Sequence, residues 1–366
     1  MTYHEHAKQQ ITYWLQLAKS TEDEYPGLFR RAEQELVSTG ARVMEFRAAH
    51  RVALSYAEQM VTSESYRLGV AQGGRTPEDF ADKMKISRLT AATVSAVNLR
   101  MTQQVYSFDP TLATALVEPE ILKNDLLKDD EGAPLPVDFL MRMPFPTFVI
   151  VPNTLTIMSI LVSSSMVPDG RGGEAFHLSI NVRMQGEDGR AANLNSTLVL
   201  RPGQTLRQCV RDTIADQQRV FGDGVDAISD REVSLRLFEF ALPLILYLCA
   251  DNREVEGDTA QPPAVTKTKR GLRLFVPERV SMARVGVRIG SVMRKYQAAR
   301  QATLGDGSGA GDRMPPHVRR QHWHTFWAGA RAQPEARYRK LHFLPPIPVN
   351  IDTYDDLQPV VHPALP

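Results

Sequence analysis

The chain of 366 residues has only two cysteines, Cys209 and Cys249. Two cysteines are too few for a disulfide framework, and both lie in apolar patterns of helical spacing, so we expect buried free thiols. An apolar N-terminal signal region is also lacking. The most apolar stretch, residues 238–250, is shorter than the roughly 18–20 residues that a membrane span needs. We therefore predict a cytoplasmic protein without membrane contact, in which this stretch is a buried core helix.

Motifs of catalysis and nucleotide binding are equally scarce. The sequence has no G-x-S-x-G and no H-E-x-x-H motif. The glycine-rich run at 305–311 lacks the G-K-[ST] ending of a phosphate-binding loop, so it is interpreted as a surface loop. These absences predict a protein that is not an enzyme and that has no cofactor. A nuclease with a site assembled from scattered residues stays open as a third alternative, because such sites leave no local signature.

A strong charge of either sign is missing too, since 43 basic and 42 acidic residues give a net charge of +1. That total hides an asymmetry along the chain. Residues 267–340 hold 17 basic and 4 acidic residues, whereas residues 1–266 hold 26 and 35, and three aspartates lie in the tail. An acidic body with a basic C-terminal segment indicates either an anionic partner or two parts that dock on each other.

The first part of the chain has the pattern of a helical region, placed at residues 1–130. Apolar residues recur at helical spacing around Trp14, and Asp109-Pro110 is a helix start, with a capping residue followed by proline at the first helical position. The predicted long helices cover residues 28–38, 41–63 and 80–105.

From residue 140 to 350 the pattern changes to an α+β domain. We predict strands at 147–151, 155–166, 175–184 and 193–200, helices at 205–221 and from Ser229 or Asp230 to Cys249, and a linker or surface loop at 251–271. In the basic segment 267–340 we favour a strand at 285–296. Residues 317–327 and 337–350 are predicted to pair as a hairpin, broken by prolines at 344–348. The fold class is therefore α+β: a helical N-terminal region, then a mixed antiparallel sheet with packed helices and a basic C-terminal segment, followed by the tail 351–366.

The most unusual window is residues 316–327, PHVRRQHWHTFW. In an extended strand Trp323 and Trp327 face one way, and His322 and His324 face the other. A metal site is disfavoured, because His317 and His342 are the only nearby third histidines and no cysteine or acid lies at ligand spacing. Contact with RNA or DNA, a protein-binding surface, and a structural strand with Trp323 and Trp327 in the core all remain open. The candidate peptide- or RNA-binding residues are Arg319, Arg320, His322, Trp323, His324, Phe326, Trp327, Arg339 and Lys340.

Several segments together resemble one family of phage and mobile-element proteins, the second family of type V-A anti-CRISPR proteins. The resemblance covers roughly residues 145–350. It is carried by residues 316–320, 322–324 and 326–327 with Gly329, by the turn 202–205, by the Leu-Pro helix 242–249, by the arginine-rich segments 288–290 and 294–297, taken as a strand, and by Pro346 with Val349-Asn350.

The resemblance implies a function that composition does not. Members of this family lower the level of the type V-A effector nuclease by recognising its nascent N-terminal peptide and promoting loss of its mRNA. For this chain it implies the cytoplasm of a bacterial host, and as partners the nascent peptide of a CRISPR effector or of another host protein, with the ribosome or mRNA nearby. The alternative is a basic nucleic-acid-binding plasmid or phage regulatory protein without anti-CRISPR activity.

Overall fold

The computed structural model describes residues 2–24, 26–27, 29–31, 34, 37, 95, 98–100, 102–117, 133–144, 147–154, 156–168, 174–186, 188–221, 225–258, 264–269, 271–305, 317–319, 322–344 and 347–349. Of the predicted N-terminal helices, 41–63 lies outside these residues, and so do most of 28–38 and 80–105. The tail 351–366 lies outside them as well.

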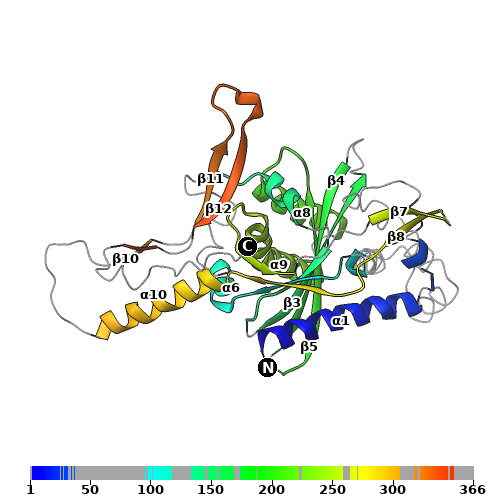
Figure 1. The fold of residues 1–366 in the computed structure, drawn as a ribbon, viewed down its shortest axis with the longest axis horizontal. Helices are drawn as coiled ribbons and strands as arrows, with labels where there is room; N and C mark the ends of the chain where they lie inside the picture. Colours follow the sequence, from blue (N-terminus) through cyan, green and yellow to red (C-terminus); the bar gives the residue numbers. More distant parts are fainter. Residues whose placement is uncertain are drawn as a thin grey trace.

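A seven-stranded sheet forms the centre of the molecule (Figure 1). Its order is β5-β4-β3-β2-β1-β9-β6. The strands are β1 (Gln104–Phe108), β2 (Thr147–Val151), β3 (Ile157–Pro168), β4 (Glu174–Gln185), β5 (Ala191–Leu200), β6 (Val255–Gly257) and β9 (Ser281–Val285). The sheet is mixed, because β1 runs parallel to both β2 and β9 while every other pair is antiparallel. The predicted mixed, mainly antiparallel sheet is therefore confirmed, and its parallel pairs both involve β1.

Helices cover both faces of this sheet (Figure 1). The helix α1 (Tyr3–Glu24) packs Ile11 and Trp14 against Val105, Val149 and Leu161. On the other face lie α6 (Pro110–Leu116), the short 3₁₀ helix η1 (Val137–Arg142), α8 (Leu206–Phe221) and α9 (Val225–Cys249). Both β1 and β2 are buried throughout, as expected for central strands with two covered faces.

The face beneath α1 is rich in buried polar groups. Trp14 Nε1 donates a hydrogen bond to Ser159 Oγ at 2.9 Å, and Ser159 Oγ donates to Gln10 Oε1 at 3.2 Å. Asn98 Nδ2 donates to Ser163 Oγ at 3.0 Å. Because a buried polar group without a partner is costly, these bonds give the α1-covered face a specific arrangement as well as apolar contact.

The helix α9 confirms the predicted core helix. Residues 241–250 are buried, with Pro243 inside the helix, and the described helices include none that is long and apolar enough to cross a membrane. Cys209 and Cys249 are buried free thiols, as predicted. The helix starts earlier than Ser229 and Asp230, because serine and aspartate occur inside helices as well as at their caps.

Three other predictions were wrong for identifiable reasons. The helix expected to reach residue 105 ends at Thr102, because Gln103 has a left-handed φ of 48° that starts the strand β1. The predicted linker 251–271 contains β6 and also β7 (Ala264–Thr268), which pairs with β8 (Gly271–Phe275). The prolines near the C-terminal end do not prevent pairing. The strand β13 (Ile347–Val349) pairs with β10 (His317–Arg319), in a two-stranded sheet that has only edge strands.

The largest correction concerns residues 287–305, which form the helix α10 (Val287–Gly305) where a strand was favoured up to residue 296. Gly286, at a φ of 71°, ends β9 and turns the chain. The carboxylate of Glu254 then accepts the backbone N–H groups of Arg288 and Ile289 at 2.6 and 3.0 Å, as an N-terminal cap does. The cap comes from a residue remote in the sequence, so the local alternation around 285–289 was misleading.

Asp109 connects α10 to the rest of the fold. Its carboxylate caps α6, as predicted, by accepting the N–H of Thr111 at 2.9 Å. Its two oxygens also accept hydrogen bonds from Arg294 Nη1, at 2.7 and 2.8 Å, and its side chain is only 6% exposed. The same carboxylate lies directly over Gly290, where a Cβ atom would collide with it.

Replacing Gly290 with alanine is therefore expected to destabilise the protein, although alanine favours a helix interior by about 1 kcal/mol over glycine. The added methyl group displaces the Asp109 carboxylate and breaks its bonds to α6 and Arg294, and we expect a loss of about 2–3 kcal/mol in the free energy of unfolding, measured by urea denaturation. The control is the same substitution in an Asp109→Ala background, where it becomes neutral or stabilising. An equal loss in both backgrounds would contradict this account.

Alkaline pH is expected to weaken the fold through buried groups that stay neutral. Burial raises the pKa of Cys249 from 9.0 to about 12 and that of Tyr247 from 10.0 to about 12. The unfolded state loses these protons first, so stability is constant below about pH 8.5 and falls from pH 9 towards 12. Urea unfolding across this range measures it, and Tyr247→Phe should make the fall shallower. Constant stability up to pH 11 would exclude this cause.

Candidate binding hairpin

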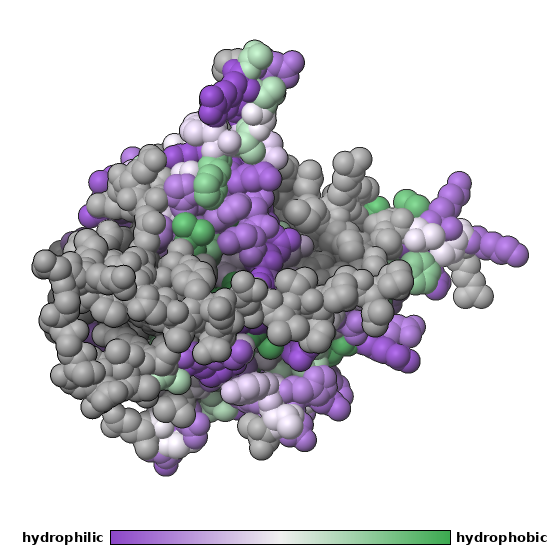
Figure 2. Space-filling view, turned by 60° about the vertical axis from the view of Figure 1, so that its left-hand side comes forward, coloured by the Kyte–Doolittle hydropathy of each residue, from purple (hydrophilic) through white to green (hydrophobic). Residues whose placement is uncertain are grey.

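A two-stranded hairpin contains most of the candidate residues. It pairs β11 (His322–Ala328) with β12 (Tyr338–Leu344), with Trp323 opposite Phe343 and Trp327 opposite Arg339. The predicted pairing of the two segments is confirmed. Gly329, at a φ of 102°, leads into the connection, which includes the 3₁₀ turn η2 (Pro334–Ala336). The hairpin projects from the body (Figure 1) and mixes hydrophilic with weakly hydrophobic residues at its end (Figure 2).

The base of the hairpin is held by a chain of aromatic rings. Trp323 is 3% exposed and packs on Phe343 at a centroid distance of 5.2 Å. Phe343 contacts Tyr247 of α9 at 5.7 Å, and Tyr247 contacts Phe108 of β1 at 5.9 Å. Edge contacts of this kind add to the burial of large apolar surface. The chain of rings therefore links the hairpin to the central strand of the sheet.

Hydrogen bonds to the backbone of β12 complete this anchor. The loop after α9 runs beside β12, where Asp251 N donates to Leu341 O at 2.8 Å and Leu341 N donates to Asp251 Oδ2 at 3.1 Å. Asn252 bonds both backbone groups of Phe343, at 2.8 and 3.0 Å. An isolated two-stranded hairpin is marginal in water, so these bonds and the ring contacts supply its support.

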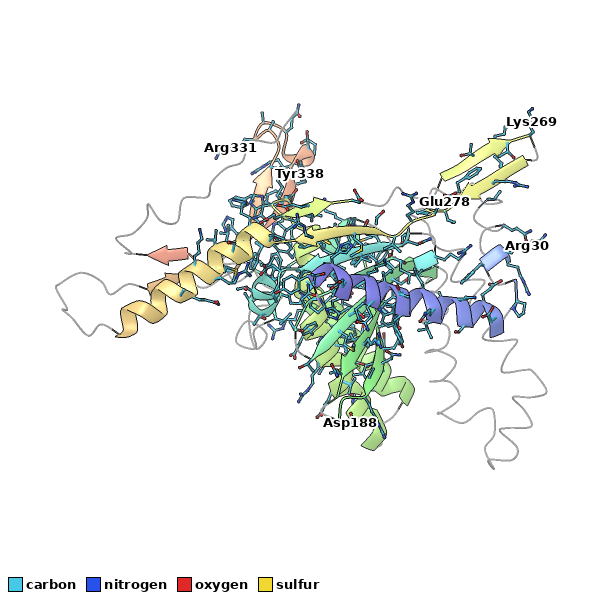
Figure 3. All side chains as sticks on the ribbon, turned by 60° about the horizontal axis from the view of Figure 1, so that its bottom comes forward. Arg30, Asp188, Lys269, Glu278, Arg331 and Tyr338 are labelled. Atoms are coloured by element: carbon cyan, nitrogen blue, oxygen red, sulfur yellow. The ribbon has the colours of Figure 1, made fainter. Side chains whose placement is uncertain are left out.

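The far end of the hairpin exposes its aromatic residues. Trp327 is 59% exposed, and the guanidinium carbons of Arg337 and Arg339 lie 5.2 and 5.7 Å from its ring centroid. Tyr338 is also exposed, and Figure 3 shows it near Arg331 at the same end. A tryptophan beside two arginines is a typical anchor for protein recognition and also stacks on nucleic acid bases.

The opposite face of the hairpin holds histidines and Phe326. His324 and His342 pair across the strands, and the Phe326 ring lies 4.0 Å from His324 and 4.7 Å from His342. Lys340 Nζ lies 5.9 Å from the Tyr338 ring. Within the described ranges no group of three metal-binding side chains is close enough to hold an ion. This face therefore offers aromatic, imidazole and ammonium groups to a partner.

The structure brings most of the predicted residues together but gives them different roles. His322, His324, Phe326, Trp327, Arg339 and Lys340 share the hairpin with Trp323, which belongs to the core. The structural alternative placed both tryptophans in the core, and this holds for Trp323 alone. Arg319 lies on the separate strand β10, and its side chain is outside the described residues, as is all of Arg320.

Two pairs of contributing residues were missed by sequence reasoning. Arg337 and Tyr338 complete the exposed end, and the position of Arg337 two residues before Arg339 was the available signal for a shared strand face. Asp251 and Asn252 anchor the hairpin from a segment that was interpreted as a linker. That pairing of distant segments left no local pattern to find.

Comparison with known proteins establishes the family. Residues 106–351 match the AcrVA2-like family, described as the Anti-CRISPR type V subtype A2 family. The chain therefore belongs to this family of anti-CRISPR proteins, as the resemblance in its sequence indicated. No curated protein matches the chain in sequence.

A solved structure shares the fold. The crystal structure of AcrVA2 superposes with a TM-score of 0.57 at 15% sequence identity, covering 93% of this chain and 98% of that chain. At this level of identity, the likeness concerns the arrangement of the backbone. It extends to residues before 106, beyond the family match.

The two hairpin tryptophans are expected to respond oppositely to substitution. Trp323→Ala removes a core ring and should lower the free energy of unfolding by about 3–5 kcal/mol. Trp327→Ala removes an exposed ring and should cost less than about 1 kcal/mol. Chemical denaturation of both variants measures the difference.

Fluorescence quenching gives an independent check of which tryptophan is exposed to solvent. The chain has three tryptophans, of which Trp14 and Trp323 are each 3% exposed and Trp327 is 59% exposed. Acrylamide should therefore quench one accessible component in the wild-type protein, and Trp327→Phe should abolish that component. Strong quenching that persists in Trp327→Phe would contradict the placement of the hairpin.

Proposed function

We propose that this chain is a mobile-element anti-CRISPR protein that lowers the level of a type V-A effector nuclease. In this proposal it recognises the nascent N-terminal peptide of the effector and promotes loss of the mRNA under translation. Family membership supports the anti-CRISPR role. The observation that carries the recognition step is the exposed Trp327 with the guanidinium groups of Arg337 and Arg339 close to its ring, on a hairpin anchored to the central sheet.

The geometry of the hairpin suits capture of a short, unfolded segment. A nascent peptide has few contacts to offer, so its binding depends on large side chains that are already in position. Trp327 offers a flat apolar ring, and the flanking guanidinium groups can donate hydrogen bonds to backbone carbonyls or carboxylates. The aromatic and hydrogen-bond anchor at the base reduces the ordering cost of binding.

The proposal needs no catalytic site in the chain. The fold would bring the effector peptide and its message together, and a ribonuclease of the bacterial host would remove the message. Purified protein should therefore leave single-stranded RNA intact in the presence of Mg²⁺. Divalent-metal-dependent cleavage that copurifies with the chain through two different columns would instead favour the nuclease alternative.

Recognition of a peptide, rather than of the message itself, can be tested by recoding. Effector mRNA is measured in cells with and without this protein. Synonymous codons at the start of the effector gene should leave the mRNA decrease unchanged, because the peptide is the same. A changed N-terminal peptide on the otherwise unaltered message should abolish the decrease. The reverse pattern would favour the nucleic-acid-binding alternative.

The role of the hairpin is tested by peptide binding and by the same mRNA measurement. Trp327→Ala should weaken binding of the full-length protein to a synthetic N-terminal effector peptide by at least about tenfold, and should restore effector mRNA. Tyr3→Ala is a matched control, because Tyr3 is an equally exposed aromatic residue, at 59%, on α1. Equal peptide binding by the wild-type protein and both variants would exclude this hairpin as the peptide site.

A further inference from the structure

A second hairpin projects from another part of the molecule. It pairs β7 with β8 over five residues each, with Thr266 opposite Arg273 and Ala264 opposite Phe275. Figures 1 and 3 show it well separated from the β11–β12 hairpin, with Lys269 at its tip and Glu278 at its base. It belongs to neither the central sheet nor the candidate binding hairpin.

The charge of this hairpin is of one sign. Residues 264–275 contain four basic residues and no acidic residue. Lys267, Lys269 and Arg273 are all exposed. Arg30 lies at the same end of the molecule in Figure 3. Positive charge therefore lies on both faces of this narrow hairpin, and this arrangement favours an anionic partner that neutralises several of the charges.

Large apolar side chains on the hairpin are exposed as well. Leu272 is 52% exposed and Phe275 is 55% exposed. Because residues two apart in a strand share a face, Phe275 and Arg273 lie on one face about 6.6 Å apart along the strand. Leu272 lies on the other face, opposite Lys267. One face therefore combines an aromatic ring with a guanidinium group.

The base of the hairpin is firmly positioned. Gln103, the residue that ends the helix before β1, donates from Nε2 to Pro277 O at 2.7 Å. The backbone oxygen of Gln103 accepts from Ser281 N at 3.0 Å, where β9 enters the sheet. The hairpin is therefore connected to the central strand pair by a short, hydrogen-bonded segment.

We propose that the β7–β8 hairpin binds single-stranded RNA. Arg273 contacts a phosphate beside the base on which Phe275 stacks, and Lys267 on the other face and Lys269 at the tip contact further phosphates of the same strand. An unpaired base is needed for this stacking, since bases in an A-form duplex are already stacked and its major groove is deep and narrow. Binding of this kind is independent of sequence, as contact with any message requires.

The biological setting rests on the proposed function, because the RNA would be the message whose product is recognised. RNA binding itself is measured with purified components, so the two proposals fail separately. A β7–β8 variant that loses RNA but still binds the effector peptide supports this inference. Loss of peptide binding in Trp327→Ala does not affect it.

Fluorescence anisotropy with the full-length protein and a labelled single-stranded RNA of mixed sequence tests the proposal. The variant Lys267→Ala/Lys269→Ala/Arg273→Ala should bind less tightly, and its plot of log affinity against log salt should be shallower by about 2, from about 0.7 per phosphate contact. The control variant Lys8→Ala/Lys19→Ala/Arg207→Ala removes three exposed charges elsewhere and should keep the wild-type slope.

Phe275 separates RNA from an acidic protein as the partner. Phe275→Leu keeps an apolar side chain but cannot stack, and it should weaken RNA binding by about five- to a hundredfold, while Phe275→Trp keeps the affinity. The inference is overturned if the triple variant binds RNA like the wild type, if the control loses as much affinity, or if leucine at 275 is tolerated. A duplex of the same sequence that binds as tightly as the single strand would also overturn it.

Discussion

The fold depends on one buried carboxylate, that of Asp109. It lies at the end of the central strand β1, and it caps α6, accepts two bonds from Arg294 and covers Gly290. A half-exposed arginine can remain hydrated on its outer side while its inner side balances the buried charge, which limits the cost of desolvation. The Asp109 carboxylate therefore joins the end of β1 to both α6 and α10. Glu254 adds the cap that starts α10. The strand–turn–helix unit at 281–305 exists because two acids from elsewhere in the chain stabilise it.

The central sheet in turn supports two hairpins with different chemistry. The β11–β12 hairpin connects to β1 through Trp323, Phe343, Tyr247 and Phe108, and it presents Trp327 beside two arginines. The β7–β8 hairpin connects to the same region through Gln103 and presents cations beside an exposed phenylalanine. The proposed coupling of a peptide to its message would need two contacts held at a fixed separation. Two hairpins on one covered sheet provide such an arrangement, and they lie in the basic segment apart from the first three residues of β7 and the last four of β12.

Much of the fold was predictable, because local patterns decide it. The strands β2 to β5 follow from alternation and β-branched residues, and α8 from its apolar spacing. The hairpin β11–β12 was predicted with six of the nine candidate residues on its two faces outside the core. The errors fall where tertiary contacts override local preference. The segment 285–296 alternates like a strand, but its first helical N–H groups are capped by Glu254, about thirty residues earlier. Trp323 and Trp327 lie on the same face of β11. Trp323 is buried because the body of the protein packs against it, whereas Trp327 lies beyond the body and is exposed.

Residue type and order alone are sufficient to predict the apolar composition of the interior, the family, the free thiols and the concentration of positive charge in 267–340. These are properties of residue type and order, and they need no partner from elsewhere in the chain. Which of those residues are buried, paired or exposed depends on the tertiary structure. It placed Arg294 inward against Asp109, Trp323 in the core, and Trp327, Arg273 and Phe275 outside. The physical reason is that exposure and pairing depend on which distant segments close over a side chain. A basic segment that looked uniform in sequence therefore divides into a structural arginine and two separate exposed hairpins.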